Sequence, residues 1–240
     1  MTAPAGLRAG YLAASLLVRP GLNAVMAKEW EGTENFPDSG FIVCANHVSN
    51  LDPLALGHLV YNQGHLPHFL AKSELFQLPV VGGLLAAMRQ IPVDRARGGN
   101  ESLLAADAVL AQGGAIIIYP EGTLTSDPEL WPMKAKTGAA RLALKTGVPV
   151  IPVAQWGIHE VMPKTAKLPS VRPRRTGRIR IGRPVALDDL RDSALTRSVL
   201  ETASERIMTA ITAELEVLRE EGAPEGRWNP RTGQREMVHP

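Results

Sequence analysis

A histidine and an aspartate stand five positions apart in the segment NHVSNLD, residues 46–52, which directly follows the apolar run FIVCA. An imidazole held by a carboxylate is the base-and-orienting pair of a catalytic triad, so His47 and Asp52 can act together as a general base. The S-x-x-D spacing of Ser49 and Asp52 is also that of a capping box at the start of a helix. The segment alone leaves both interpretations open, an active-site base or an ordinary helix start.

Two more polar segments directly follow apolar runs of strand length. In YPEGT, residues 119–123, Glu121 and Gly122 form an acidic turn with exposed amide groups. Such a turn can hold an anion when a cation is also present. In IPVDRARGG, Arg95 comes after a short strand, where a planar guanidinium can bind a phosphate through two hydrogen bonds. Taken singly, the first is equally well an ordinary turn and the second a solvated surface charge.

The chain offers no good nucleophile and no metal site. Its one cysteine, Cys44, lies within an apolar run, where a thiol is usually inert, and a single cysteine excludes an internal disulfide and fits a reducing compartment. Ser49 stands outside any G-x-S-x-G elbow, and we expect it to cap the helix that follows. His65 and His68 have the spacing of metal ligands, but no third ligand is near them in the sequence, so no metal is expected.

The elements that would position these residues alternate along the chain. Strands are predicted at residues 41–45, 68–71, 91–94, 115–119, 148–156 and 178–182. Helices are predicted at residues 53–61, 80–88, 100–112, 137–146 and 196–221. Gly113 and Gly147 follow two of these helices and suit the left-handed residue after a helix end. The alternation predicts an α/β fold, a single domain with a largely parallel sheet flanked by helices, in which the polar segments converge on the carboxyl edge.

The two ends of the 240-residue chain differ from its middle. Residues 1–28 hold an uncharged apolar run between Arg8 and Arg19, which is shorter than the roughly 20 residues that span a membrane. We predict an N-terminal helix that associates with a membrane surface; the alternatives are a terminal helix packed on the domain and a cleaved signal. Residues 29–221 are predicted as the folded domain. Residues 222–240, rich in proline, glycine and charge, are predicted as a flexible tail.

Four segments in this order resemble the glycerolipid acyltransferases related to 1-acyl-sn-glycerol-3-phosphate acyltransferase. They are NHVSNLD, IPVDR, YPEGT and VPVIPVA, within residues 46–154. The resemblance implies that residues 29–221 are an acyltransferase domain, that His47 is the general base and that Asp52 fixes its tautomer. The residues that it assigns to binding of the acceptor are Lys72, Arg95, Glu121, Gly122 and Thr123.

One position departs from the family pattern. The family commonly has an arginine directly after E-G-T, where this chain has Leu124. A guanidinium is therefore missing from the expected phosphate site, which bears on the identity of the acceptor. Lys134, Lys136 and Arg141 are the nearby cations that could replace it.

The resemblance implies an O-acyltransferase that moves a fatty acyl chain from a thioester, acyl-CoA or acyl-ACP, to the free hydroxyl of 1-acyl-sn-glycerol 3-phosphate. The product would be phosphatidic acid, in phospholipid biosynthesis. The thioester is a co-substrate, so neither a cofactor nor a metal is expected. Another lyso-lipid or a glycolipid hydroxyl is the alternative acceptor, and a non-catalytic lipid-binding relative is the alternative outside the enzyme class. The expected location is the cytoplasmic side of the cell membrane, in peripheral or monotopic contact.

The charge of the chain argues against nucleic acid as a partner. The formal net charge is +2, which gives no general attraction for a polyanion. Arginines are dense in VRPRRTGRIRIGR, residues 171–183, but no aromatic residues are interleaved with them. This stretch fits a solvated loop as well as it fits attraction to anionic lipid headgroups or to an acidic acyl carrier protein.

Overall fold

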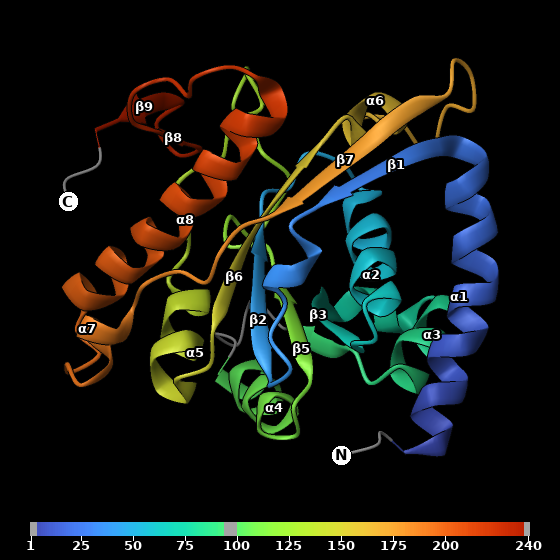
Figure 1. Cartoon of the computed structure of the whole chain (residues 1–240), viewed down its shortest axis with the longest axis horizontal. Coiled ribbons are helices and arrows are strands. Elements are labelled where there is room, and N and C mark those ends of the chain that lie inside the picture. Colours follow the sequence, from blue (N-terminus) through green and yellow to red (C-terminus); the bar gives the residue numbers. More distant parts are fainter. Residues whose placement is uncertain (1–3, 94–99, 238–240) are drawn as a thin grey trace.

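The computed structural model describes residues 4–93 and 100–237, and its centre is a seven-stranded sheet with the order β1-β7-β6-β2-β5-β3-β4 (Figure 1). The strands are β1 Met26–Glu31, β2 Phe41–Ala45, β3 Pro67–Lys72, β4 Ile91–Val93, β5 Ala115–Ile118, β6 Val150–Trp156 and β7 Arg175–Ile181. Neighbouring strands are parallel except β6 and β7, which are antiparallel. The predicted α/β fold with a largely parallel sheet is confirmed.

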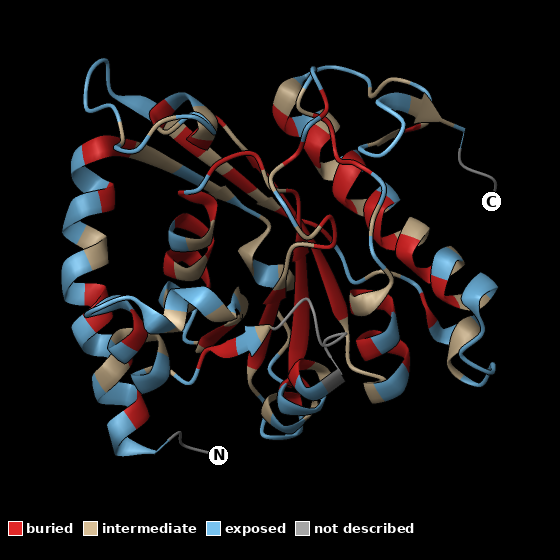
Figure 2. Ribbon diagram, turned by 180° about the vertical axis from the view of Figure 1, so that it is seen from behind, coloured by how far each residue is buried: buried red, intermediate tan, exposed pale blue. Residues whose placement is uncertain are grey.

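Helices cover both faces of this sheet. They are α1 Ala5–Val25, α2 Asp52–Asn62, α3 Val81–Ala87, α4 Asn100–Ala111, α5 Gly138–Thr146, α6 Ile158–Val161, α7 Asp188–Arg191 and α8 Arg197–Arg219, with 3₁₀ turns at Thr33–Asn35 and Ser73–Gln77. Apolar side chains of α1, α2 and α6 form the core on one face, and those of α4, α5 and α8 form the core on the other. The central strands between them are buried (Figure 2).

The strand that leads to His47 lies at the middle of the sheet. β2 has the predicted bounds, and all five of its residues are buried. It pairs with β5 through Phe41 and Ala115 and with β6 through Ile42 and Val150. A short, continuous apolar run is typical of a strand covered on both faces. Because β2, β5 and β6 are parallel, their carboxyl ends lie on the same edge of the sheet.

The helices also follow their predicted ranges closely, and the two glycine stops are found. Gly113 and Gly147 have φ angles of 79° and 70°. The amide of Gly147 donates to the carbonyl oxygen of Ala143 over 2.9 Å, so this glycine satisfies a carbonyl at the end of α5. A residue with a Cβ would be strained in this left-handed conformation, which accounts for glycine at the helix end.

The N-terminal segment is a helix only as far as Val25. α1 buries Leu7, Tyr11 and Leu22 against the domain, while Leu12, Leu16 and Leu17 are 56%, 68% and 74% exposed. Among the residues that the structure describes, no helix is both long enough and apolar enough to cross a bilayer.

The predicted boundary at residue 28 is wrong, because the chain enters β1 at Met26 and pairs in parallel with β7. Glutamate and lysine are infrequent in strands, so the sequence MAKEWE gives little β signal. Its burial nevertheless alternates, with Met26 and Trp30 contributing to the core. β1 is an edge strand, where charged side chains are common because one side of the ladder faces solvent.

The C-terminal segment folds where a flexible tail is predicted. β8 Arg227–Asn229 and β9 Gln234–Glu236 form an antiparallel hairpin, and Arg227 is buried. The guanidinium of Arg227 pairs with Glu205 over 2.8 Å. Composition alone does not reveal this hairpin, because the groups that hold it come from distant parts of the chain.

Candidate active site

The predicted pair of His47 and Asp52 is present in the structure. Nδ1 of His47 lies 3.0 Å from Oδ2 of Asp52. An ionised carboxylate only accepts hydrogen bonds, so this contact places the ring proton on Nδ1 and leaves Nε2 as the free base. The His47 side chain is 16% exposed and that of Asp52 is fully buried. The imidazole is thus the member of the pair that a substrate can reach.

The turn before α2 aims several donors at the Asp52 carboxylate. Oδ2 accepts hydrogen bonds from the amides of Val48 and Ser49 over 2.7 and 2.8 Å. Asp52 is also the first residue of α2, where the helix dipole favours a negative charge. Amide hydrogen bonds to a carboxylate favour its charged form. The local fold therefore fixes the buried Asp52 side chain through main-chain donors and does not expose it to water.

Only one half of the predicted capping box forms. Asp52 reaches back to the amide of Ser49, but the helix begins at Asp52 and Leu51 precedes it without a side-chain cap. The prediction that Ser49 caps the helix is wrong. Its hydroxyl instead donates to the carbonyl oxygen of Met162 over 2.7 Å and accepts from the amide of Leu51, which anchors the turn to α6.

Neither of the two side chains considered as nucleophiles is available. Ser49 is fully buried and its hydroxyl proton is used by Met162. Cys44 is fully buried in β2, and burial raises the pKa of its thiol far above the ordinary value. A neutral buried thiol is a poor nucleophile. The site therefore has a base and its orienting carboxylate, and neither Ser49 nor Cys44 supplies a nucleophile.

The segment after β5 holds His47 from the other side. The ring of Tyr119 stacks on the imidazole with centroids 4.1 Å apart and planes 20° apart. The amide of Thr125 donates to the carbonyl oxygen of His47 over 2.8 Å. The sequence reasoning gave Tyr119 no role, and the only signal was its place at the start of the YPEGT segment.

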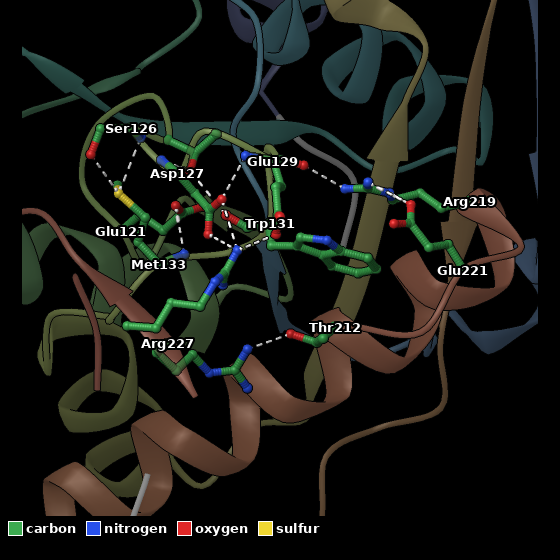
Figure 3. A network of polar contacts seen from close by, with 12 residues as sticks. Glu121, Ser126, Asp127, Glu129, Trp131, Met133, Thr212, Arg219, Glu221 and Arg227 are labelled. Atoms are coloured by element: carbon green, nitrogen blue, oxygen red, sulfur yellow. Dashed lines mark hydrogen bonds and ion pairs between the residues drawn. The ribbon is translucent and has the colours of Figure 1, made fainter. Parts of the chain in front are cut away.

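Glu121 turns inward and binds the main chain. Oε1 accepts from the amide of His47 over 3.2 Å. Oε2 accepts from the amide of Met133 over 3.0 Å (Figure 3). Burial raises the pKa of this carboxyl to about 8, although its amide hydrogen bonds act in the opposite direction. The carboxyl group ties the histidine turn to the chain at Met133. Its predicted role in acceptor binding remains a prediction.

The segment that contains Met133 also contacts the C-terminal hairpin. The amide of Lys134 donates to the carbonyl oxygen of Trp228 over 3.0 Å. Arg227 of β8 contacts α8 through Glu205 and Thr212. Arg235 of β9 pairs with Asp127 over 2.7 Å. Figure 3 shows Arg227, Thr212 and Asp127. A continuous series of contacts thus runs from the hairpin through Met133 and Glu121 to His47.

A second pair of side chains that the sequence reasoning missed joins β2 to β6. Nδ2 of Asn46 donates to the carbonyl oxygen of Gln155 over 3.0 Å, and Oδ1 accepts from the amide of Gln155 over 2.8 Å. Nε2 of Gln155 donates to the carbonyl oxygen of Asn46. Both residues are buried. A polar side chain inside an apolar run such as VPVIPVAQW was the available signal, because buried polar groups need partners.

The predicted acceptor ligands follow neighbouring strands along the same edge. Lys72 ends β3, is exposed and is in register with Val93 of β4. Arg95 follows β4 but lies outside the described residues. Thr123 is exposed in the turn after β5. In the strand order β5 lies between β2, which leads to His47, and β3, which ends at Lys72.

Gly122 identifies the cation nearest to the acidic turn. Its φ is +72°, and a Cβ built on it would lie 3.0 Å from Nζ of Lys136. Lys134, in contrast, pairs with Glu236 over 3.5 Å. Of Lys134 and Lys136, Lys136 is therefore the one that lies against the E-G-T turn, at Gly122.

Comparisons with known proteins agree with this geometry. The sequence matches the family model described as Acyltransferase over residues 28–156. It is 34% identical to the chloroplastic 1-acyl-sn-glycerol-3-phosphate acyltransferase of Brassica napus over 137 residues, which is 55% of this chain and 38% of that protein. It is 35% identical to the 1-acyl-sn-glycerol-3-phosphate acyltransferase of Bacillus subtilis over 128 residues, 52% of this chain and 60% of that protein.

The fold has a counterpart among solved structures. The crystal structure of the 1-acyl-sn-glycerophosphate acyltransferase from Thermotoga maritima superposes with a TM-score of 0.62 at 26% sequence identity, over 91% of this chain and 80% of that one. The matched family region begins within β1 and ends with β6, so it contains the His47–Asp52 pair and the edge described above. The chain belongs to the acyltransferase family.

Proposed function

We propose that this protein is an O-acyltransferase that transfers a fatty acyl chain from acyl-CoA or acyl-ACP to the free hydroxyl of 1-acyl-sn-glycerol 3-phosphate, forming phosphatidic acid. The observation that carries the proposal is the His47–Asp52 contact of 3.0 Å, in which the imidazole is accessible and neither Ser49 nor Cys44 is an available nucleophile. The names of the relatives in Brassica napus, Bacillus subtilis and Thermotoga maritima support this acceptor.

The chemistry needs one base and an activated acyl donor. Nε2 of His47 takes the proton of the acceptor hydroxyl while its oxygen attacks the thioester carbonyl carbon. Asp52 stabilises the imidazolium through Nδ1–H. The tetrahedral intermediate then collapses, the C–S bond breaks, and the thiolate takes the proton from Nε2. The products are an ester and a free thiol, and general-base catalysis of this kind contributes a factor of about 10² to 10⁴.

The acceptor phosphate would bind at the carboxyl ends of β3, β4 and β5. Lys72, Arg95 and Lys136 are the cations that follow or face these strand ends, with Gly122 and Thr123 in the same turn. A cation next to an anion offsets the loss of hydration. With Leu124 in place of the usual arginine, Lys136 would supply the missing charge as a point cation without a bidentate fork.

The protein would contact the cytoplasmic side of the cell membrane through α1. Leu12, Leu16 and Leu17 are exposed on this helix. Further exposed apolar side chains stand at residues 78–81, just before and at the start of α3. α1 and α3 approach closely, since a Cβ on Gly10 would lie 3.1 Å from the carbonyl oxygen of Ala87. An apolar surface of this kind fits peripheral insertion into the headgroup region.

The decisive assay supplies acyl-CoA or acyl-ACP together with lysophosphatidate in vesicles and follows both thiol release and the lipid product. We expect phosphatidic acid from the wild-type protein, and a decrease in kcat of about 10² to 10⁴ for His47→Ala with the fold retained. Thiol release only with another lyso-lipid or a glycolipid would identify the alternative acceptor class, which the Leu124 position favours. If no acceptor gives a product, the remaining interpretation is a non-catalytic lipid-binding protein.

A further inference from the structure

Two cations contact Asn23 near the end of α1, and a third, Arg19, lies one helical turn before it and donates to Asn62. Nζ of Lys28, from β1, donates to Oδ1 of Asn23. NH2 of Arg174, just before β7, donates to the carbonyl oxygens of Asn23 and Met26 over 3.0 and 3.4 Å. Arg19 precedes Asn23 by one helical turn, so the two residues lie on the same side of α1. We call Arg19, Lys28 and Arg174 the cationic cluster.

The partners of the cationic cluster are neutral in the described part of the chain. Within residues 4–93 and 100–237, none of its members forms an ion pair, and their side-chain partners are the neutral amides of Asn23 and Asn62. Burial and the positive charges of Arg19 and Arg174 lower the pKa of Lys28. Like charges held together repel one another. A bound anion would remove this repulsion.

Aromatic and imidazole groups line the cluster. The guanidinium of Arg19 lies 5.3 Å from the ring centroid of Tyr61, and Nζ of Lys28 lies 5.6 Å from that of Trp30. His58 packs edge-on against Trp30 and is more than nine-tenths buried. Its Nδ1 is buried and has no hydrogen-bond partner in the described part of the chain, and the charges of Lys28 and Arg19 contribute to lowering the pKa of His58 after burial, the main cause.

Helix capping explains only part of this arrangement. Arg174 binds carbonyl oxygens at the end of α1, where a cation interacts favourably with the helix dipole. Arg19 and Lys28 do not bind such carbonyl groups; each donates to an amide side chain. Their charges therefore remain available to a ligand.

We infer that the cationic cluster binds a phosphate group, with two guanidinium forks and one ammonium as its ligands. Its place on α1 favours the headgroup of an anionic membrane lipid over a soluble phosphate. Arg19 comes directly after the turn that carries exposed Leu16 and Leu17, so insertion of those leucines would bring the cluster to headgroup depth. Tryptophan and tyrosine are enriched at that same depth.

Sedimentation of the full chain with vesicles tests this inference, using phosphatidylcholine with and without phosphatidylglycerol. Each cation near an anionic surface accounts for roughly fivefold in affinity, so we expect about a fivefold loss for Lys28→Gln and on the order of 100-fold for the triple variant R19Q/K28Q/R174Q. The matched control K145Q/R197Q/R231Q loses three exposed charges elsewhere and should bind as the wild type does. Lys28→Gln keeps both helix-capping contacts of Arg174, so it remains informative if the triple variant unfolds.

A second arm measures binding of glycerol 3-phosphate without vesicles, by calorimetry. Binding that the cluster variants lose, combined with vesicle binding equal to that of the control, would support the site with a soluble phosphate as its ligand. If the cluster variants and the control behave alike in both arms, the inference is overturned. Neither arm requires turnover, so this result is independent of whether the proposed acyl transfer is found.

Discussion

The imidazole of His47 is fixed from several directions by neighbouring groups of the chain. Asp52 holds Nδ1, the ring of Tyr119 covers one face, and Thr125 binds the carbonyl oxygen. Such contacts matter because a base acts only within hydrogen-bond reach of the proton that it removes. A change in ring orientation should therefore reduce turnover without weakening substrate binding.

Replacement of Tyr119 tests this positioning role. Tyr119→Leu removes the stacked ring, and we expect kcat to fall on the order of 10²-fold with KM nearly unchanged, as for a misplaced catalytic group. Tyr119→Phe keeps the ring and should keep most of kcat. Steady-state kinetics of both variants, with circular dichroism as the check on folding, measures the effect. A Tyr119→Leu enzyme with wild-type kcat would show that the stacking has no part in orienting His47.

The buried carboxyl of Glu121 predicts how stability depends on pH. Burial raises its pKa in the folded state from the ordinary 4.5 to about 8. The folded state therefore binds this proton more tightly than the unfolded state, so its contribution to stability is complete below about pH 4.5 and is lost as the pH rises through about 8. The unfolding free energy of the wild type should fall between about pH 6 and pH 9.

Glu121→Gln isolates this effect, because an amide does not titrate in that range. The variant loses one of the two amide contacts, which costs about 1–3 kcal/mol. Between about pH 6 and pH 9 its unfolding free energy should fall less than that of the wild type. Urea unfolding of both proteins at each pH measures the difference. Equal pH dependence in both proteins would mean that Glu121 is ionised in the folded state throughout.

At the scale of elements, the sequence predicts structures that depend on local patterns but not pairings between distant segments. β2 is a short apolar run, and its bounds followed directly from FIVCA. β1 is a charged edge strand, and its pairing with β7, more than a hundred residues away, leaves little mark on its own composition. The His47–Asp52 contact was predictable because it forms within one turn. The Asn46–Gln155 contact joins segments 109 residues apart in the sequence, so no local sequence spacing predicts it.

The C-terminal hairpin offers a prediction about element stability. Arg227 is buried and bonded to Glu205 and Thr212, so Arg227→Met leaves these groups without their partner. Because Glu205 keeps part of its exposure, we expect a loss of about 2–3 kcal/mol, less than for a fully buried pair. The melting temperature should fall by roughly 5–10 °C.

Arg231, in the turn of the same hairpin, provides the control. Its side chain is exposed, and Arg231→Met should change stability by no more than about 0.5 kcal/mol. Thermal unfolding followed by circular dichroism compares the two variants. If both behave alike, the hairpin contributes no more to the stability of the domain than the flexible tail predicted from its composition.

At the scale of the whole molecule, α1 connects the proposed membrane contact with the catalytic edge. It packs beside α2, whose first residue is Asp52 (Figure 1). Its exposed leucines and the cationic cluster at its end are separate from the polar segments that follow β2, β3 and β5. A lipid acceptor could therefore be held at a membrane surface while its hydroxyl reaches His47. The leucines should matter only when the substrate is presented in a bilayer.

The variant L12Q/L16Q/L17Q tests that condition. Loss of three apolar side chains from the interface should reduce vesicle affinity on the order of 10²-fold, at about 1 kcal/mol for each partly inserted leucine. Activity toward vesicle-bound lysophosphatidate should fall with it. Activity toward a dispersed short-chain acceptor should be retained, because His47 and Asp52 are unchanged. The control L104Q/L195Q/V217Q removes exposed apolar side chains from α4, α8 and the segment before α8. If both triple variants lose vesicle activity equally, α1 is not the membrane-contacting surface.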